Sequence, residues 1–324
     1  MLRDILKGDP QIEAWVTVVQ ANDPDVLVIG DIDFDLHGVA LAALADRLGD
    51  YPYRFTRRPN RGLDSGRDLN ANGRFGEPED AEGYGDFAGQ GGMAVLSRVP
   101  ILEDDMRDFT GFAWGDIPDD LRVGDGLDPT LLSTTVHWDL PLALGSGKVL
   151  RLLIWHGTAP VFDGPEDRNG RRNHDETRFW QLYIDGRLGE APAAPFVVIG
   201  TANADPLDGE SRPEAIRALL RHPALRDLAP ESIGAREAAA RDGGVNAQHV
   251  GAADLDTVDW PDDAGDPGNL RVDYVLPSVD LSVLAQGVVW PSDDDPFSQA
   301  VTAASRHRLI WVDVEMGDRL ADRD

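Results

Sequence analysis

The stretch "PFVVIGTANADP", residues 195–206, joins a short apolar run to a polar turn. Residues 196–199 form a short, largely β-branched apolar run, which predicts a buried strand. The run then stops and is followed at once by Thr201, Asn203 and Asp205. Because α/β proteins tend to carry their chemistry at the carboxyl ends of strands, this turn is a candidate functional corner, with an ordinary strand exit as the alternative.

The bulk composition fits a globular protein with a sizeable core. The chain has 324 residues, 42% hydrophobic and 27% charged, and we expect one domain over residues 1–324. No apolar run approaches the roughly 20 residues that a membrane span needs. The start, "MLRDILKGDPQIE", lacks the features of a signal peptide. The sequence as written therefore predicts a cytoplasmic protein, whereas a periplasmic or secreted one would need an export signal upstream of Met1.

The charge balance is strongly acidic. Fifty-eight Asp and Glu residues against 30 Lys and Arg give a net charge of −28. Such a surface repels a polyanion, and nucleic-acid binders usually carry a basic patch. Tight nucleic-acid binding is therefore disfavoured, while a small phosphate substrate in a locally basic pocket remains compatible. The absence of cysteine excludes disulfides, thiolate zinc sites and cysteine nucleophiles.

The order of predicted elements indicates two packed, mixed sheets with helices outside. Helices are expected over 10–22, 36–50, 173–186 and 212–223, and strands over 25–31, 51–57, 91–101, 149–157, 270–278, 282–290 and 307–316. The alternating segment 131–142 is predicted to be an outer strand. Residues 59–90 and 223–268 are predicted to be long loops, and their length suggests a functional or ion-stabilised role.

Polar residues of catalytic type stand at the ends of several predicted strands, including Asp31, His156 and His307. Asp273 lies inside the apolar strand "LRVDYVLPS". Because an unpaired buried carboxylate is expensive, Asp273 is expected to have a partner. A histidine is the natural one, since a carboxylate on one imidazole nitrogen fixes the tautomer and raises the basicity of the other.

Six segments occur in an order that resembles the endonuclease/exonuclease/phosphatase superfamily of DNase I-like enzymes: "PDVLVIGD", "GGMAVLSRVPI", "LLIWHG", "FVVIGTANADP", "RVDYVLPS" and "SRHRLIWVDV". The resemblance extends from about residue 9 to 316, and "HGTAPVFDGPEDRNGRRNHDE" (156–176) is similar to a run in a bacterial branch. It implies a four-layer α/β sandwich of two packed mixed β-sheets flanked by helices. The family's first strand should precede the helix at residue 10, and we expect it to be absent from the sequence as written.

The same resemblance implies a site. A divalent metal, Mg²⁺ or Mn²⁺, would bind Asp31, and His156 would contact the phosphate. Asn203 would position nucleophile and phosphate. His307 would be the catalytic histidine and Asp273 its partner.

Two family carboxylates are replaced in this chain. The usual Gly-Asp-x-Asn turn is Gly-Thr-Ala-Asn at 200–203, and the usual Ser-Asp-His ending is Ser-Arg-His at 305–307. Thr201 cannot act as a general base. Arg306 cannot bind a cation, but a guanidinium can hold a phosphate bidentately. Thr201 and Arg306 are therefore candidate substrate-binding residues.

The densest charged run is "FDGPEDRNGRRNHDE", residues 162–176. Its arginines, among them Arg171 and Arg172, offer the local basic patch that a phosphate substrate would need. The alternative is structural, with Asn173 or Asp175 capping the helix that follows.

A second candidate ion site is "DLNANGRFGEPE", residues 68–79. It matches the calcium-loop pattern, with potential ligands at Asp68, Asn70, Asn72 and Glu79. The flanks do not resemble EF-hand helices, so Ca²⁺ would have a structural role here. A solvated turn rich in Asn and Gly is the alternative.

Three functions stay open at this point. The first is a divalent-metal-dependent phosphoesterase with an altered site, acting on a phosphodiester or phosphomonoester. The second is a catalytically impaired scaffold that binds an anionic ligand through Arg306 and the arginine-rich run. The third is a secreted, calcium-stabilised nuclease with its export signal upstream. The acidic charge favours a small or lipid-linked phosphate ester as substrate.

Overall fold

The computed structural model describes residues 1–124 and 126–315. Its larger sheet has five strands in the order β4-β5-β6-β7-β8. These strands are β4 (Arg107–Asp108), β5 (His137–Ala143), β6 (Val149–His156), β7 (Phe196–Thr201) and β8 (Asp273–Pro277). Only β6 and β7 run parallel, and the other neighbours are antiparallel, so the sheet is mixed.

The second sheet is antiparallel, with the order β1-β3-β2, and a separate ribbon pairs β10 with β9. The strands are β1 (Val26–Ile32), β2 (Tyr53–Thr56), β3 (Gly92–Ser97), β9 (Ser282–Val288) and β10 (Ile310–Glu315). Apolar side chains of the two sheets share one core, in which Phe55 and Val95 lie with Trp138 and Leu152. The sheets therefore pack face to face.

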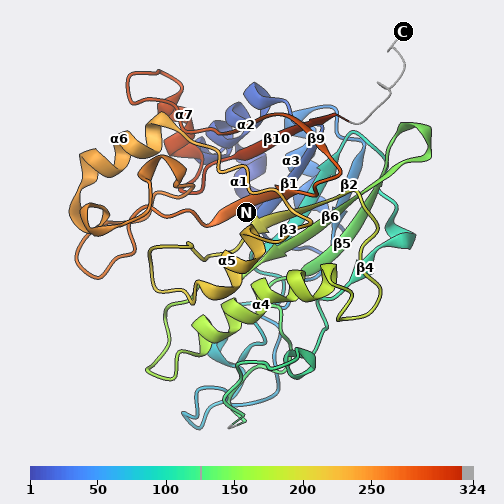
Figure 1. The fold of residues 1–324 in the computed structure, drawn as a ribbon, viewed down its shortest axis with the longest axis vertical. Helices are drawn as coiled ribbons and strands as arrows, with labels where there is room; N and C mark the ends of the chain where they lie inside the picture. Colours follow the sequence, from blue (N-terminus) through green and yellow to red (C-terminus); the bar gives the residue numbers. More distant parts are fainter. Residues whose placement is uncertain (125, 316–324) are drawn as a thin grey trace.

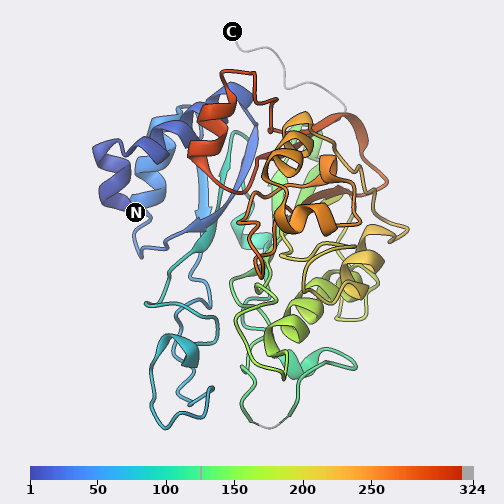
Figure 2. The same ribbon diagram turned by 90° about the vertical axis from the view of Figure 1, so that its left-hand side faces the viewer.

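Helices cover the outer faces of both sheets (Figures 1 and 2). On the side of β1 and β3 lie α1 (Leu2–Lys7), α2 (Pro10–Asn22) and α3 (Val39–Leu48); on the side of β6 and β7 lie α4 (Arg168–Ile184) and α5 (Glu214–Leu220). Two further helices, α6 (Ile233–Asp242) and α7 (Ser298–Ala304), pack beside β9 and α2 respectively. The predicted helix–sheet–sheet–helix layering is confirmed.

The chain before β1 is helical. Residues 1–25 contain α1 and α2 and no strand. The helix α2 begins at Pro10, where its missing N–H costs nothing, and the Asp9 carboxylate accepts the Gln11 N–H at 2.9 Å.

Two predictions about secondary structure are wrong. The segment 131–142 does not form an outer strand, because β5 lies between β4 and β6 and is buried on both faces. The alternation of apolar and polar residues in this segment predicted one solvent-facing side, but the polar residues His137 and Asp139 are themselves buried. The segment 223–268 is not an unbroken loop, since it contains α6, whose alanine-rich sequence lacks an apolar stripe. The predicted end of the last strand, Met316, lies outside the described residues.

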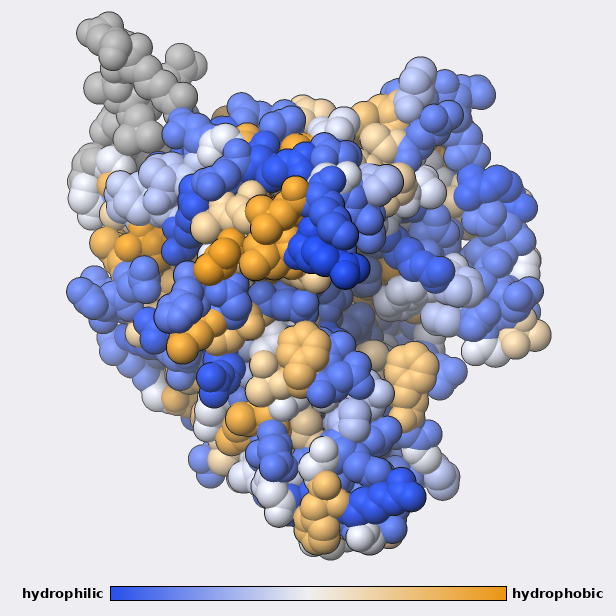
Figure 3. All heavy atoms as spheres, turned by 180° about the vertical axis from the view of Figure 1, so that it is seen from behind, coloured by the Kyte–Doolittle hydropathy of each residue, from blue (hydrophilic) through white to orange (hydrophobic). Residues whose placement is uncertain are grey.

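The visible surface is largely hydrophilic. Figure 3 shows small apolar patches separated by hydrophilic residues on the face opposite to that of Figure 1. Within the described residues, the longest helices are too short or too polar to cross a bilayer.

His137 is buried in the core and makes the free energy of unfolding depend on pH. The ring stacks on Trp180, with 5.2 Å between centroids; Nε2 donates to the Glu176 carbonyl at 3.0 Å, and the Ser133 hydroxyl donates to Nδ1 at 2.6 Å. Burial lowers the pKa of His137 from 6.5 to about 4. The unfolded chain therefore binds this proton more tightly than the folded one, and stability is lost as pH falls from 6.5 towards 4.

We expect His137 alone to remove roughly 2–3 kcal/mol of unfolding free energy between pH 7 and pH 4.5. Urea unfolding at both pH values measures the loss. His137→Gln keeps a polar side chain but does not titrate, so its loss should be smaller by that amount. An equal loss of unfolding free energy in the wild type and His137→Gln would show that His137 is not the source of this pH dependence.

Candidate functional site

Three of the predicted site residues form one row at an edge of the larger sheet. His156, the last residue of β6, pairs in register with Thr201, the last residue of β7. Thr201 pairs in turn with Asp273, the first residue of β8. The polar row arises because the apolar runs of β6 and β7 end at the same level.

Asp273 is the centre of a hydrogen-bond cluster. Its Oδ1 accepts the Thr201 hydroxyl at 2.6 Å, and its Oδ2 accepts the Thr257 hydroxyl at 3.0 Å. The Nδ1 of His307 lies 2.9 Å from Oδ2 and 3.1 Å from Oδ1. Asp273 is 8% exposed, so these donors compensate for the burial of its carboxylate. The expected histidine partner of Asp273 is therefore His307.

His307 is positioned to exchange protons. Because Nδ1 donates to Asp273, Nε2 is the ring nitrogen left for proton exchange, and it makes no hydrogen bond to any of the described residues. The ring meets Trp260 edge-on, with 5.6 Å between centroids, and the side chain is one-third exposed. Burial alone would lower the pKa of His307, but the charge and hydrogen bond of Asp273 outweigh it and raise the pKa above 6.5.

Asp31 and His156 lie next to this cluster. Asp31 has a φ of 52°, an uncommon value for a non-glycine residue. Burial raises the pKa of the Asp31 carboxyl, but the charges of His156 and Arg61 outweigh it and hold the pKa below its ordinary value. Burial lowers the pKa of His156, whose Nδ1 is buried and has no hydrogen-bond partner among the described residues. The structure thus brings Asp31, His156, Thr201, Asp273 and His307 together.

Asn203 helps to hold the loops around the row. It has a φ of 51°, and its Nδ2 donates to the Gly157 carbonyl at 2.9 Å. Asn173 on α4 donates to the carbonyls of Thr158 and Ala202, each at 2.7 Å. Both amides connect the loop after β6 to the loop after β7.

Arg306 is not part of the cluster. Its side chain is exposed, and its charge acts on Asp259. The following arginine, Arg308, is the one that pairs with Asp259, at 2.7 Å. The cation beside Asp31 is instead Arg61, a residue that the sequence patterns did not single out.

The arginine-rich run is largely structural in its contacts. Arg172 is 4% exposed, and its guanidinium donates to the carbonyls of Leu131 and Leu132 at 2.9 and 2.8 Å. It therefore does not contribute to an open basic patch. Arg171 is half-buried, and its Nε and Nη2 have no partner among the described residues.

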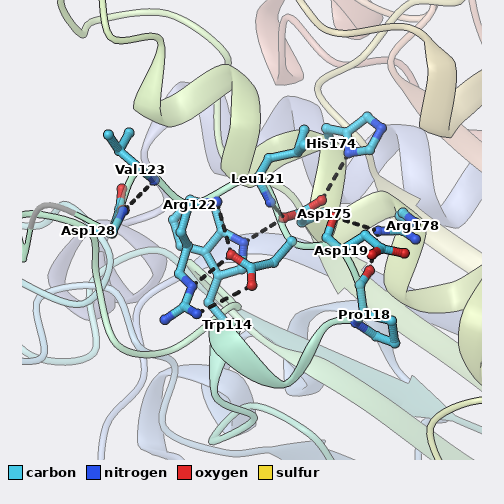
Figure 4. A network of polar contacts seen from close by, with 12 residues as sticks. Trp114, Pro118, Asp119, Leu121, Arg122, Val123, Asp128, His174, Asp175 and Arg178 are labelled. Atoms are coloured by element: carbon cyan, nitrogen blue, oxygen red, sulfur yellow. Dashed lines mark hydrogen bonds and ion pairs between the residues drawn. The ribbon is translucent and has the colours of Figure 1, made fainter.

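The prediction that Asn173 or Asp175 caps a helix is wrong, because α4 already begins at Arg168. Asp175 lies inside the helix, and its Oδ2 accepts the Trp114 indole N–H and the Leu121 amide, both at 2.7 Å (Figure 4). Arg178 donates to the carbonyls of Pro118 and Asp119 (Figure 4). The charged residues of α4 therefore hold the neighbouring loop.

The predicted calcium loop forms a turn held by its own polar groups. Both carboxylate oxygens of Asp68 accept backbone amides, those of Asn72 at 3.1 Å and Gly73 at 2.8 Å. Asn70 also accepts the Asn72 amide, and Glu79 is exposed. Calcium binding by this loop stays a prediction.

The divalent metal implied by the resemblance fits these residues poorly. Mg²⁺ and Mn²⁺ prefer several oxygen ligands, with carboxylates foremost. Here Asp31 pairs with Arg61, and Asp273 is already engaged by His307, Thr201 and Thr257. Across residues 1–124 and 126–315, no group of three or more His, Asp or Glu side chains is placed to hold a metal ion.

Two of the residues that build the site, Arg61 and Thr257, lie in the segments predicted to be long loops. A local pattern does not distinguish them from other loop residues, so their roles depend on contacts made across the fold.

Comparisons with known proteins agree with the fold. A profile described as "Endonuclease/Exonuclease/phosphatase family" matches residues 2–307. A solved protein of that description from Beutenbergia cavernae has a TM-score of 0.54 at 18% sequence identity. The match covers 95% of this chain and 66% of the Beutenbergia chain, so this chain spans just under two-thirds of that protein. A family protein from Leptotrichia buccalis has a TM-score of 0.53 at 15% identity, over 94% and 93% of the two chains. A 3′-5′ exonuclease from Neisseria meningitidis has a TM-score of 0.50 at 15% identity, over 95% of each chain. No curated protein matches the sequence.

Proposed function

The chain belongs to the endonuclease/exonuclease/phosphatase family, and on that premise we propose that it hydrolyses a phosphate ester at the edge of the larger sheet. The observation that carries the proposal is the His307–Asp273 pair, with 2.9 Å between Nδ1 and Oδ2, fixed by two threonine hydroxyls. Such a pair is what general acid–base catalysis needs.

The chemistry assigned to these residues is proton transfer and charge stabilisation. The free Nε2 of His307 takes a proton from the attacking water, while Asp273 keeps the tautomer and stabilises the imidazolium. Arg61 and His156 lie beside Asp31, next to the same centre. In this proposal they bind the phosphoryl oxygens, on which charge accumulates during transfer. A divalent metal, where one binds in this family, supplies the same charge stabilisation.

The proposed substrate is a small or lipid-linked phosphate ester. The net charge of −28 opposes a long polyanion. A single phosphate ester carries little charge, and its phosphate can be bound by local cations.

A scaffold that binds an anionic ligand without turnover is the second candidate. It is favoured by the replacement of two family carboxylates with Thr201 and Arg306, which removes groups that would otherwise activate water or hold metal.

The test is hydrolysis of p-nitrophenyl phosphate and bis(p-nitrophenyl) phosphate by the full chain, in EDTA and with Mg²⁺, Mn²⁺ or Ca²⁺. We expect turnover of at least one ester. Its rate should rise with pH through the raised pKa of His307, because the base must be neutral. Absence of turnover with either ester under every condition would replace this proposal with the binding scaffold.

A further inference from the structure

Arg61 occupies the position next to the acid that the family resemblance assigns to metal binding. Its Nη1 lies 2.5 Å from the Asp31 Oδ1 and 3.2 Å from the Gly91 carbonyl oxygen. The side chain is 23% exposed, so the guanidinium is partly shielded from water while remaining accessible. A cation therefore already compensates the Asp31 carboxylate.

The backbone that carries Arg61 is fixed by its neighbours. Asn60 is 4% exposed, and its Nδ2 donates to the carbonyls of Thr110 at 2.7 Å and Ser133 at 2.8 Å. The Asn60 N–H donates to the Thr135 carbonyl at 3.0 Å, and the Arg61 carbonyl accepts the Gly89 N–H at 3.1 Å. The guanidinium is thus presented by a tightly bonded loop, although it belongs to a long irregular segment.

Gly91 leaves the space that the guanidinium fills. Its φ is 52°, and a Cβ added there would lie 2.4 Å from Arg61 Nη1 and 3.0 Å from Asp31 Oδ1. A larger residue at position 91 would therefore separate the ion pair. The Gly91 N–H donates to Asp33 Oδ1 at 3.1 Å, which holds this turn against the end of β1.

The free edge of the guanidinium suits an oxyanion. Nη1 makes both hydrogen bonds of Arg61 to Asp31 and Gly91, and within the described part of the chain Nε and Nη2 make none. The Nε–Nη2 edge of arginine presents two parallel N–H groups, which match two oxygens of one phosphate. The charges of His156 and His307 both lower the pKa of the Asp31 carboxyl that Arg61 contacts, so this ion pair lies near the proposed proton-transfer pair.

We infer that Arg61 is the fixed cation of this site, binding the phosphate of a phosphate ester directly and without a divalent metal. The inference rests on the proposed function for its ligand class. It extends that function by replacing the metal with a guanidinium of this chain. Asp31 then acts as a positioning residue that orients Arg61.

The experiment is calorimetric titration of inorganic phosphate into the full chain, in EDTA and separately in Mg²⁺ or Mn²⁺. We expect binding of equal affinity in all three. Arg61→Ala should weaken it about 10- to 100-fold, the usual effect of losing a bidentate charged contact. Arg61→Lys keeps the charge but loses the bidentate geometry, so its affinity for phosphate should lie between those of the wild type and Arg61→Ala. Arg74→Ala changes an arginine on the same long loop that pairs with Glu77, and this variant should bind phosphate as the wild type does.

Urea unfolding of each variant separates a local effect from loss of the fold. If Arg61→Ala does not fold, Gly91→Ala provides a second test, because it displaces the same guanidinium from Asp31. Phosphate binding that requires Mg²⁺ or Mn²⁺, or that is unchanged in Arg61→Ala, would overturn the inference.

Failure of the proposed function would look different. Metal-free phosphate binding that depends on Arg61, together with no ester hydrolysis, would support Arg61 as the phosphate-binding cation and contradict the phosphoesterase proposal. Ester hydrolysis that EDTA abolishes would support the phosphoesterase proposal and contradict the inference that Arg61 replaces the metal.

Discussion

His307→Ala should reduce ester hydrolysis by about 10²- to 10⁴-fold, the range typical for loss of a general acid–base group. The reduction should appear mainly in kcat, because the proton is transferred only in the transition state. The reason is geometric: His307 is the histidine that contacts Asp273, and its Nε2 is the free nitrogen. Assaying both nitrophenyl esters across pH 5–9 measures the effect and shows whether the rise of rate with pH disappears.

The chain contains a matched control for this substitution. His222 contacts Asp185 with 3.2 Å between Nε2 and Oδ1, a second His–Asp pair located after α5. His222→Ala should leave the rate and its pH dependence unchanged. Asp273→Asn should resemble His307→Ala, since an amide can stabilise the wrong tautomer and carries no charge. Equal rates in wild type and His307→Ala would exclude the pair as the acid–base group.

Gly200→Ala should destabilise the fold by about 3 kcal/mol. Gly200 has a φ of 152°, and a Cβ there would lie 1.9 Å from the backbone oxygen of Trp155 on the parallel strand β6. Backbone cannot rotate away as a side chain can, so β6 and β7 would have to separate. The same change would displace Thr201 and weaken its hydrogen bond to Asp273, so activity should fall as well.

Urea unfolding at pH 7 measures this loss. The matched control is Gly111→Ala: Gly111 is exposed, has no positive φ, and an added Cβ would meet no atom within 4 Å. It should unfold within about 0.5 kcal/mol of the wild type. An unchanged unfolding midpoint for Gly200→Ala would show that β6 and β7 can adjust to the methyl group.

The features of this protein that depend on local residue patterns could be predicted from its sequence. The apolar runs of β6 and β7 are predicted because consecutive buried residues mark buried strands. The pairing of Asp273 with a histidine follows from the cost of an unpaired buried carboxylate. Pro at the start of α2 and the helical spacing of its apolar residues give that helix its observed bounds, 10–22.

The pairing of distant polar and charged groups depends on how the chain folds. Arg61 and Asp31 are 30 residues apart, and Thr257 and Asp273 are 16 apart, with irregular chain in between. The polar alternation of β5 predicted an outer strand, whereas its buried His137 and Asp139 find partners inside the core. The guanidinium on Asp31 comes from Arg61, in a segment predicted to be a long loop. Hydrophobic periodicity is a property of neighbouring residues, but an ion pair between distant segments forms only where the closed fold brings them together.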